Sequence, residues 1–255
     1  MAPGWVGAAL AGTEDAPVRL FCFPHAGGGS AVFRPWRAAL APVIQVRPVV
    51  LPGRESRLRE PPCTAMAQVI PPLFEALAPC LDRPFAFFGH SMGAVIAYEI
   101  ARQCAAAGQP GPVCLFASAR RAPHLPHRRR YHDLPDTAFV TAVAALGGMP
   151  GEVLDQPELL RLFLPALRAD FQLNDTYAPS PGPALRCPVA AYAADTDPEA
   201  SQEQVAAWAD ATSGPFRYRT FPGGHFYLSG SAEILRMIRL DLESLSGYRL
   251  PSLSP

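Results

Sequence analysis

The sequence predicts an α/β fold in which helices flank a mostly parallel central sheet. Short apolar runs typical of buried strands alternate with helical segments along the chain, as in β-α-β units. One such run, residues 85–88, leads directly into a G-x-S-x-G pattern and a helix of small residues. The length of 255 residues suits one large domain and is too short for two.

Six apolar runs are expected to form the strands of this sheet. The run 18–23 has β-rich composition and stops at Pro24, and the run 44–51 is interrupted by Pro48. The other expected strands are residues 85–88, 113–118, 189–194 and 216–221.

Helical segments are expected between these strands. Residues 64–77 contain Pro71 and Pro72, which predict a kink or a split, since a proline inside a helix removes a backbone donor. The other expected helices are residues 32–40, 94–107, 199–210 and 231–245.

Strand-like runs are missing between residues 119 and 186, where helices are expected at 137–146 and 157–174. Such a stretch predicts a helical lid above the sheet, where this class of fold builds substrate pockets. The predicted organisation is a loose N-terminal leader (1–16), a core (17–118 and 187–255) and a helical lid insertion (119–186).

Aromatic residues of the lid are candidates for an acyl-binding pocket. Phe139, Phe163 and Phe171 lie in the two expected lid helices. The alternative is that they pack the lid itself, because an amphipathic helix needs an apolar stripe to pack at all.

Composition excludes several classes of function. The formal net charge is zero, so we expect neither a nucleic-acid partner nor an anionic membrane surface. No run is long and apolar enough to span a bilayer, and the N-terminus lacks the basic region of a signal peptide. The six cysteines show neither a C-x-x-C pair nor zinc spacing, so we expect reduced thiols, no metal and a cytoplasmic location.

Ser91 is the candidate nucleophile. It is the central residue of Gly89-His90-Ser91-Met92-Gly93, between an expected strand and an expected helix. A sharp turn there holds the serine in a strained conformation, and the flanking glycines leave room for neighbouring backbone. The alternative is a tight turn with an inert hydroxyl.

His225 and Asp197 are the candidate partners of Ser91. His225 follows the last strand in a Gly-Gly loop, and Asp197 follows the strand before it. The order Ser, Asp, His is that of the α/β-hydrolase fold, with histidine as general base and aspartate orienting it. Asp195 remains an alternative to Asp197. His90 is interpreted as structural, and His25 as shaping the neighbouring loop.

The glycine loop after the first strand, His25-Ala26-Gly-Gly-Gly29, lies where this fold places part of its oxyanion hole. The backbone N–H groups of Ala26 and Met92 are therefore the candidate oxyanion donors. A flexible turn is the alternative. Phosphate binding is not favoured, because the Walker lysine and a G-x-G-x-x-G pattern are both missing.

Arginines are concentrated at the start of the lid, in Arg120-Arg121 and in Arg128, Arg129 and Arg130. The simplest interpretation is a solvated basic edge. The functional interpretation is a docking patch for an acidic protein partner, for which Arg128, Arg129 and Arg130 are the candidates.

Taken together, these motifs resemble the stand-alone type II thioesterases of polyketide and nonribosomal peptide synthesis. The matching stretches are residues 21–29, Leu51-Pro-Gly-Arg-Glu55, the elbow 89–93, the Asp195-x-Asp197 turn and Gly223-Gly-His225. The family often has glycine where this chain has Ala194, just before the first aspartate.

The resemblance implies a serine thioesterase that removes acyl groups from the phosphopantetheine arm of acyl or peptidyl carrier proteins and so clears stalled or misloaded synthases. It supports Ser91, Asp197 and His225 as the triad and Ala26 with Met92 as oxyanion donors. No cofactor is expected, because the substrate carries the phosphopantetheine, and a monomer is expected. The alternatives are a carboxylesterase, lipase or cyclising thioesterase on the same fold, or a non-catalytic binding protein.

Overall fold

A parallel six-stranded sheet forms the centre of the molecule. The computed structural model describes residues 4–127, 129–148, 156–179, 181–228 and 232–251. The strand order is β2-β1-β3-β4-β5-β6, and all five neighbouring pairs run parallel. The strands are β1 (Val18–Phe23), β2 (Ile44–Pro48), β3 (Phe85–His90), β4 (Leu115–Ser118), β5 (Val189–Ala194) and β6 (Phe216–Phe221).

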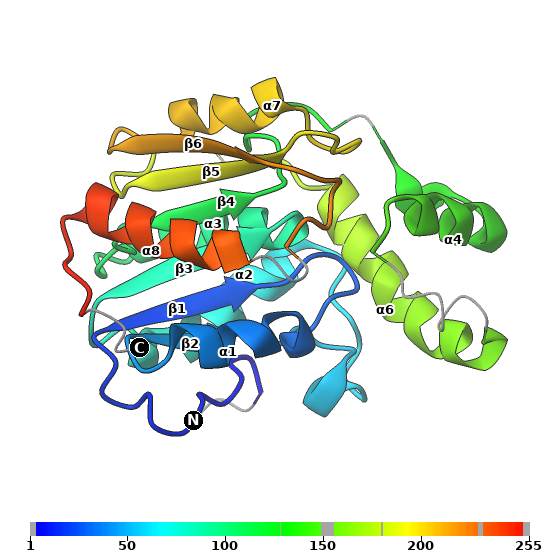
Figure 1. The fold of residues 1–255 in the computed structure, drawn as a ribbon. Helices are drawn as coiled ribbons and strands as arrows, with labels where there is room; N and C mark the ends of the chain where they lie inside the picture. The colour runs from blue at the N-terminus through cyan, green and yellow to red at the C-terminus, as the bar shows by residue number, and fades with distance from the viewer. Residues whose placement is uncertain (1–3, 128, 149–155, 180, 229–231, 252–255) are drawn as a thin grey trace.

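Helices cover both faces of this sheet (Figure 1). One face packs against α1 (Arg34–Leu40) and α8 (Ala232–Ser246). The other packs against α2 (Met66–Leu77), α3 (Met92–Ala106) and α7 (Gln202–Ala206). Each face has its own continuous apolar core, which explains why the strand sequences are apolar on both sides. The α/β prediction is therefore confirmed.

Helix α2 runs through Pro71 and Pro72 without the expected split. Both prolines lie away from its buried side, which carries Val69, Leu73 and Leu77 at a spacing of four. The carbonyls that lose a donor belong to residues 67 and 68, which are exposed, so water can hydrogen-bond them.

The N-terminal segment was expected to be a loose leader, and its described part is not. Trp5 is buried, and its indole ring packs under the Arg57 guanidinium at 3.9 Å. Val50 N donates to the Trp5 carbonyl at 2.8 Å, and Val6 pairs antiparallel with Val49. These backbone bonds and the buried indole fasten the segment to the chain just after β2.

Two helices, α4 (Asp136–Ala145) and α6 (Pro157–Asp175), lie beyond one end of the sheet (Figure 1). They correspond to the helical segments predicted for the lid, and they share a small apolar core of their own. Among the described residues, no helix is long and apolar enough to cross a membrane. The six cysteines are free thiols.

Candidate active site

Ser91 lies at the turn between β3 and α3, beside the point where the strand order of the sheet reverses between β1 and β3. Open α/β sheets bind ligands at such a point. The backbone of Ser91 has φ +54° and ψ −116°, a strained conformation for a residue with a side chain. A Cβ on Gly93 would lie 2.0 Å from the Phe23 carbonyl oxygen, and one on Gly89 would lie 2.3 Å from the Gly93 carbonyl oxygen. Both glycines are therefore required by the close approach of backbone.

His225 connects Ser91 to a buried carboxylate. Its Nε2 lies 2.9 Å from the Ser91 Oγ, and its Nδ1 lies 3.0 and 2.9 Å from the two carboxylate oxygens of Asp197. The side chain of His225 is 5 % exposed, and that of Asp197 is fully buried. When Nδ1–H donates to the carboxylate, Nε2 is left as the acceptor that faces the serine hydroxyl. Three side chains far apart in the sequence thus form one hydrogen-bonded chain.

Asp195 and Asp197 have different partners, which separates the two alternatives. The carboxylate of Asp195 accepts from the Gly223 N–H at 2.8 Å and so fastens the loop that carries His225. The carboxylate of Asp197 contacts the imidazole itself and also accepts from the Glu199 N–H at 2.8 Å. Asp197 is therefore the carboxylate placed to orient His225, and Asp195 supports the loop.

Two further imidazoles lie close to His225. His90 is fully buried, and its Nδ1 lies 2.9 Å from the Ser118 Oγ. Burial holds the pKa of His90 well below its usual range, and burial together with His225 and Arg54 lowers that of His25 to about 4. Both rings are therefore neutral at pH 7 and add no positive charge beside the His225 imidazole.

The glycine loop after β1 is held in place by hydrogen bonds from several directions. Gly28 N donates to the His25 carbonyl at 2.9 Å, as in a tight turn. The Arg54 Nη1 donates to the Gly28 carbonyl at 2.8 Å, and the Gly27 N–H donates to the carboxylate of Asp170 at 2.7 Å. The loop therefore has a defined conformation, which an oxyanion hole requires.

The two candidate oxyanion donors border the nucleophile. Ala26 lies on the glycine loop and lines the same cavity as Ser91. Met92 is the first residue of α3, so its N–H belongs to the helix N-terminus, where backbone donors lack a partner within the helix.

Arg54 and Asp170 form a buried ion pair that the sequence did not reveal. Arg54 Nη1 and Nη2 lie 2.8 and 2.7 Å from the two oxygens of Asp170, and the side chains are 9 % and 2 % exposed. Burial alone would lower the pKa of Arg54, but Asp170 outweighs it and the pKa is raised. The available signal was an aspartate within an apolar stretch of a predicted lid helix. The pair joins the loop after β2, the glycine loop and α6.

Ser91 opens onto a cavity of about 320 Å³ between the sheet and the lid. Of the predicted acyl-pocket residues, Phe163 and Phe171 line it. Phe139 does not, and this prediction was wrong. Its ring is fully buried in the lid core, 5.3 Å from the Phe171 ring and beneath the Arg168 guanidinium. The lid needs this side chain to pack its two helices together.

The predicted basic edge divides into two parts. Arg129 pairs with Glu199, and Arg130 pairs with Asp133 at 2.5 Å, while Arg128 lies outside the described residues. Arg120 and Arg121 are not on an edge at all, because both are buried and line the cavity with Ser91. Docking of an acidic partner at Arg128–Arg130 stays a prediction, and the carboxylates beside Arg129 and Arg130 reduce its electrostatic basis.

Both the sequence and the fold are similar to those of known thioesterases. A family model described as "Thioesterase domain" matches residues 18–242. The thioesterase PikA5 of Streptomyces venezuelae is 41 % identical over 216 residues, which are 84 % of this chain and 77 % of that protein. Linear gramicidin dehydrogenase LgrE of Brevibacillus parabrevis is 40 % identical over 243 residues, 93 % of this chain and 92 % of that protein. The structure of the type II thioesterase BorB, from the borrelidin biosynthetic cluster, has a TM-score of 0.85 at 38 % identity and covers 93 % of this chain and 97 % of its own.

The dehydrogenase name of LgrE has no counterpart in the present site. A dinucleotide-binding loop after the first strand would carry G-x-G-x-x-G, and this sequence has no such pattern. Its first glycine loop instead lines the same cavity as Ser91.

Proposed function

The chain belongs to the thioesterase family, a group of serine hydrolases on the α/β-hydrolase fold, and from this premise we propose that Ser91, His225 and Asp197 hydrolyse acyl thioesters carried on the phosphopantetheine arm of carrier proteins. The observation that carries the proposal is the hydrogen-bonded chain of these three side chains, which opens onto a cavity between the sheet and the lid. Support for a carrier-bound substrate comes from relatives such as BorB, a type II thioesterase of a biosynthetic cluster.

In the first step, Ser91 Oγ attacks the thioester carbonyl while His225 Nε2 takes its proton over the 2.9 Å contact. Asp197 accepts from Nδ1–H, which keeps the ring in the required tautomer and stabilises the imidazolium. The pantetheine thiolate then leaves and takes up the proton that His225 Nε2 holds, which returns the imidazole to its neutral form. Because a thiolate is a better leaving group than an amine, this step asks less of the general acid than peptide cleavage does.

The tetrahedral intermediate carries a negative oxygen, and the N–H groups of Ala26 and Met92 donate to it. Removal of one such donor costs about 3 to 4 kcal/mol of transition-state stabilisation in other hydrolases. The hydrogen bonds of Gly27 and Gly28 to Asp170 and Arg54 hold the glycine loop ready for this task.

In the second step, water replaces the thiol. His225 takes a proton from the water as it attacks the acyl group on Ser91, and then returns it to the Ser91 oxygen as the free acid leaves. The acyl chain lies in the part of the cavity lined by Phe163, Phe171 and neighbouring apolar lid residues. Clearing acyl groups from stalled or misloaded synthases, by a monomer in the cytoplasm, is the role that this chemistry suits.

The test is to incubate the protein with carrier proteins that bear a series of acyl chains and to follow deacylation by intact mass. Wild-type protein is expected to return the free carrier and the acid, and Ser91→Ala to leave the acyl carrier intact. A protein that cleaves simple p-nitrophenyl esters but leaves every acyl carrier untouched would instead be a carboxylesterase. A cyclised product in place of the acid would identify a macrocycle-forming enzyme.

A further inference from the structure

Arg120 and Arg121 lie buried beside the nucleophile. Strand β4 ends at Ser118, which pairs with His90 in the register of the sheet, and Ser91 N donates to the Ser118 carbonyl at 2.8 Å. The chain after β4 therefore leaves the sheet next to Ser91. Arg120 and Arg121 are 5 % and 7 % exposed, and both line the cavity that contains Ser91.

These two guanidinium groups lack the acceptors that buried arginines normally have. Arg120 Nη1 donates to the Asn174 side chain at 2.5 Å, but the buried Arg120 Nε has no partner among the described residues. Arg121 makes neither a hydrogen bond nor an ion pair with any residue that the structure describes. Buried charges are normally paired, because an isolated ion is costly to remove from water.

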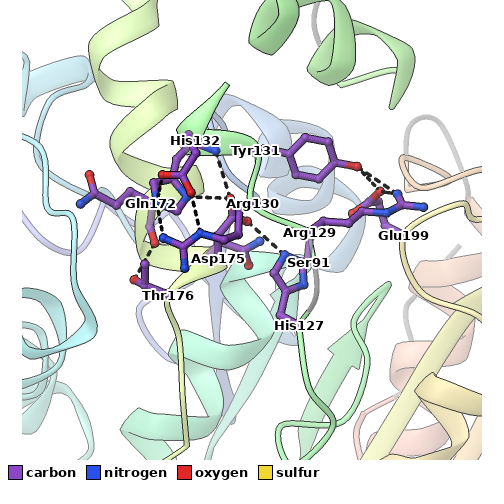
Figure 2. Close-up of polar contacts among 12 residues, drawn as sticks. Ser91, His127, Arg129, Arg130, Tyr131, His132, Gln172, Asp175, Thr176 and Glu199 are labelled. Carbon is purple, nitrogen blue, oxygen red and sulfur yellow. Dashed lines mark hydrogen bonds and ion pairs between the residues drawn. The ribbon is translucent and has the colours of Figure 1, made fainter. Parts of the chain in front are cut away.

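The nearest carboxylates are already occupied by other groups (Figure 2). Glu199 also lines the cavity, but it pairs with Arg129 and accepts from the Tyr131 hydroxyl at 2.6 Å. Asp175 is contacted by His127 Nε2 at 3.1 Å and by His132 Nδ1 at 3.0 Å. Neither carboxylate lies within ion-pair distance of the two buried arginines, although both act on them at longer range and partly offset the effect of burial on their pKa values.

Both guanidinium groups nevertheless stay charged at neutral pH. Burial lowers the pKa of Arg120 to about 9, with a further contribution from Arg121, and lowers that of Arg121 to about 10. At pH 7 these values leave both side chains protonated. The cavity that Ser91 lines therefore also has two charged guanidinium groups in its wall, and few of their N–H bonds are used by described residues.

We propose that Arg120 and Arg121 form an anion subsite of the cavity, which binds a carboxylate carried on the acyl chain of the substrate. A ligand carboxylate supplies the missing acceptor, and a guanidinium is suited to bidentate binding of such a group. Phosphate in the pantetheine arm is the other available anion, but it lies at the far end of the arm from the thioester. A carboxylate on a short acyl chain lies a few bonds from the reacting carbonyl and so stays within the cavity that Ser91 and both arginines line. This inference rests on the proposed thioesterase function.

The subsite should make the enzyme select acyl chains that carry a carboxylate. A monothioester of a short dicarboxylic acid offers a carbonyl to the serine and a carboxylate to the arginine pair, whereas an alkyl acyl chain of the same length leaves the arginines without acceptors. Sites built to bind a polar group discriminate against analogues that lack it. Other apolar acyl chains still reach Ser91 through the lid side of the cavity, which Phe163 lines.

The kinetic test compares malonyl and butyryl N-acetylcysteamine thioesters, which have acyl chains of similar length and no phosphate. For Arg121→Gln, kcat/KM for the malonyl thioester is expected to fall roughly 10- to 100-fold, the effect of losing a charged hydrogen bond. The butyryl value is expected to change less than about threefold, on the same principle. Arg236→Gln, at an exposed site on α8, is the matched control and is expected to leave both values unchanged. Enzyme-free samples correct for spontaneous loss of the malonyl group.

Binding of malonate to the proposed subsite can be measured independently of turnover. Calorimetry on the Ser91→Ala protein should show binding of malonate, and the Ser91→Ala/Arg121→Gln protein should not. Equal losses for both thioesters, or malonate binding that does not depend on Arg121, would overturn the proposal. Arg121-dependent binding of phosphopantetheine without malonate binding would overturn the assignment to a carboxylate. If wild-type protein hydrolyses neither thioester nor any acyl carrier, the proposed thioesterase function is wrong. The malonate binding experiment still tests the anion subsite in that case.

Discussion

On the glycine-loop side of Ser91, Arg54 meets Asp170 through hydrogen bonds of 2.8 and 2.7 Å, and the pair is almost completely buried. On the β4 side, Arg121 is buried to a similar degree but meets no carboxylate within ion-pair distance among the described residues. Both arginines line the same cavity. Arg54 thus has a counter-ion at hydrogen-bond distance, whereas Arg121 has none among the described residues.

The difference separates a structural role from a ligand-binding role. A buried cation with a bidentate carboxylate is already satisfied, so Arg54 can hold backbone in place and gains nothing from a ligand. A buried cation without a counter-ion is costly in the free protein, and a ligand that supplies an acceptor recovers this cost. We therefore expect substitutions on the first side to affect folding and the reaction rate, and substitutions on the second to affect substrate choice.

The largest effect on stability is expected for Arg54→Met. This change leaves Asp170 buried without its partner, and breaking a buried pair in this way costs about 3 to 5 kcal/mol of unfolding free energy. Chemical denaturation measures the loss. Because the glycine loop also loses its hydrogen bond to Arg54, kcat is expected to fall by roughly 100-fold, the effect of one misplaced oxyanion donor.

The double variant Arg54→Met/Asp170→Leu is the control that separates these two effects. Removing both charges should restore most of the stability, since no unpaired ion remains. The rate should stay low, because Gly27 and Gly28 still lack the groups that hold them. Full recovery of kcat in the double variant would show that the ion pair has no part in positioning the loop.

Acid should destabilise the glycine-loop side through His25. Its pKa is about 4 in the folded protein and near 6.5 when unfolded, so the unfolded state binds the additional proton between these values. His25 should leave the unfolding free energy unaffected above pH 6.5 and lower it by at most about 3 kcal/mol as the pH decreases toward 4, in addition to the fall that His90 causes. Denaturation curves across this range should be flatter for His25→Asn. An equally steep decline in that variant would assign the effect to other groups.

The smallest effect on stability is expected on the β4 side. Arg121→Met removes a buried charge and leaves no partner behind, so the unfolding free energy should stay the same or rise by about 1 kcal/mol. The measurement is the same denaturation experiment as for Arg54→Met. A loss comparable to that of Arg54→Met would mean that Arg121 is already satisfied in the folded protein, and the contrast between the two sides would disappear.

Local patterns were sufficient to predict the parallel strands, Ser91 and His225, but they left Asp195 as an alternative to Asp197. The strands at residues 189–194 and 216–221 have the predicted bounds, because uninterrupted β-rich runs between turn residues admit few other structures. Ser91 and His225 each lie in a glycine-flanked turn directly after a strand, so their neighbours along the chain identify them. In both cases the relevant signal lies within a few residues.

Features that depend on distant residues could not be predicted. Arg54 and Asp170 are separated by 116 positions, and nothing near either residue indicates the other. Burial of Arg120 and Arg121 depends on α6 lying over the end of β4, whereas the local sequence is simply arginine-rich. Phe139 has the same local pattern as the aromatic residues that line the cavity, and only the packing of the lid helices distinguishes it.

The activated hydroxyl of Ser91 is tested most directly by an active-site fluorophosphonate followed by intact mass and peptide mapping. One adduct is expected on the wild-type protein, located on Ser91, with none on Ser91→Ala. Labelling of His225→Gln should be slower by roughly 1,000-fold or more, since the general base is lost. An unlabelled wild-type protein, or an adduct on any residue other than Ser91, would show that Ser91 is not an activated nucleophile.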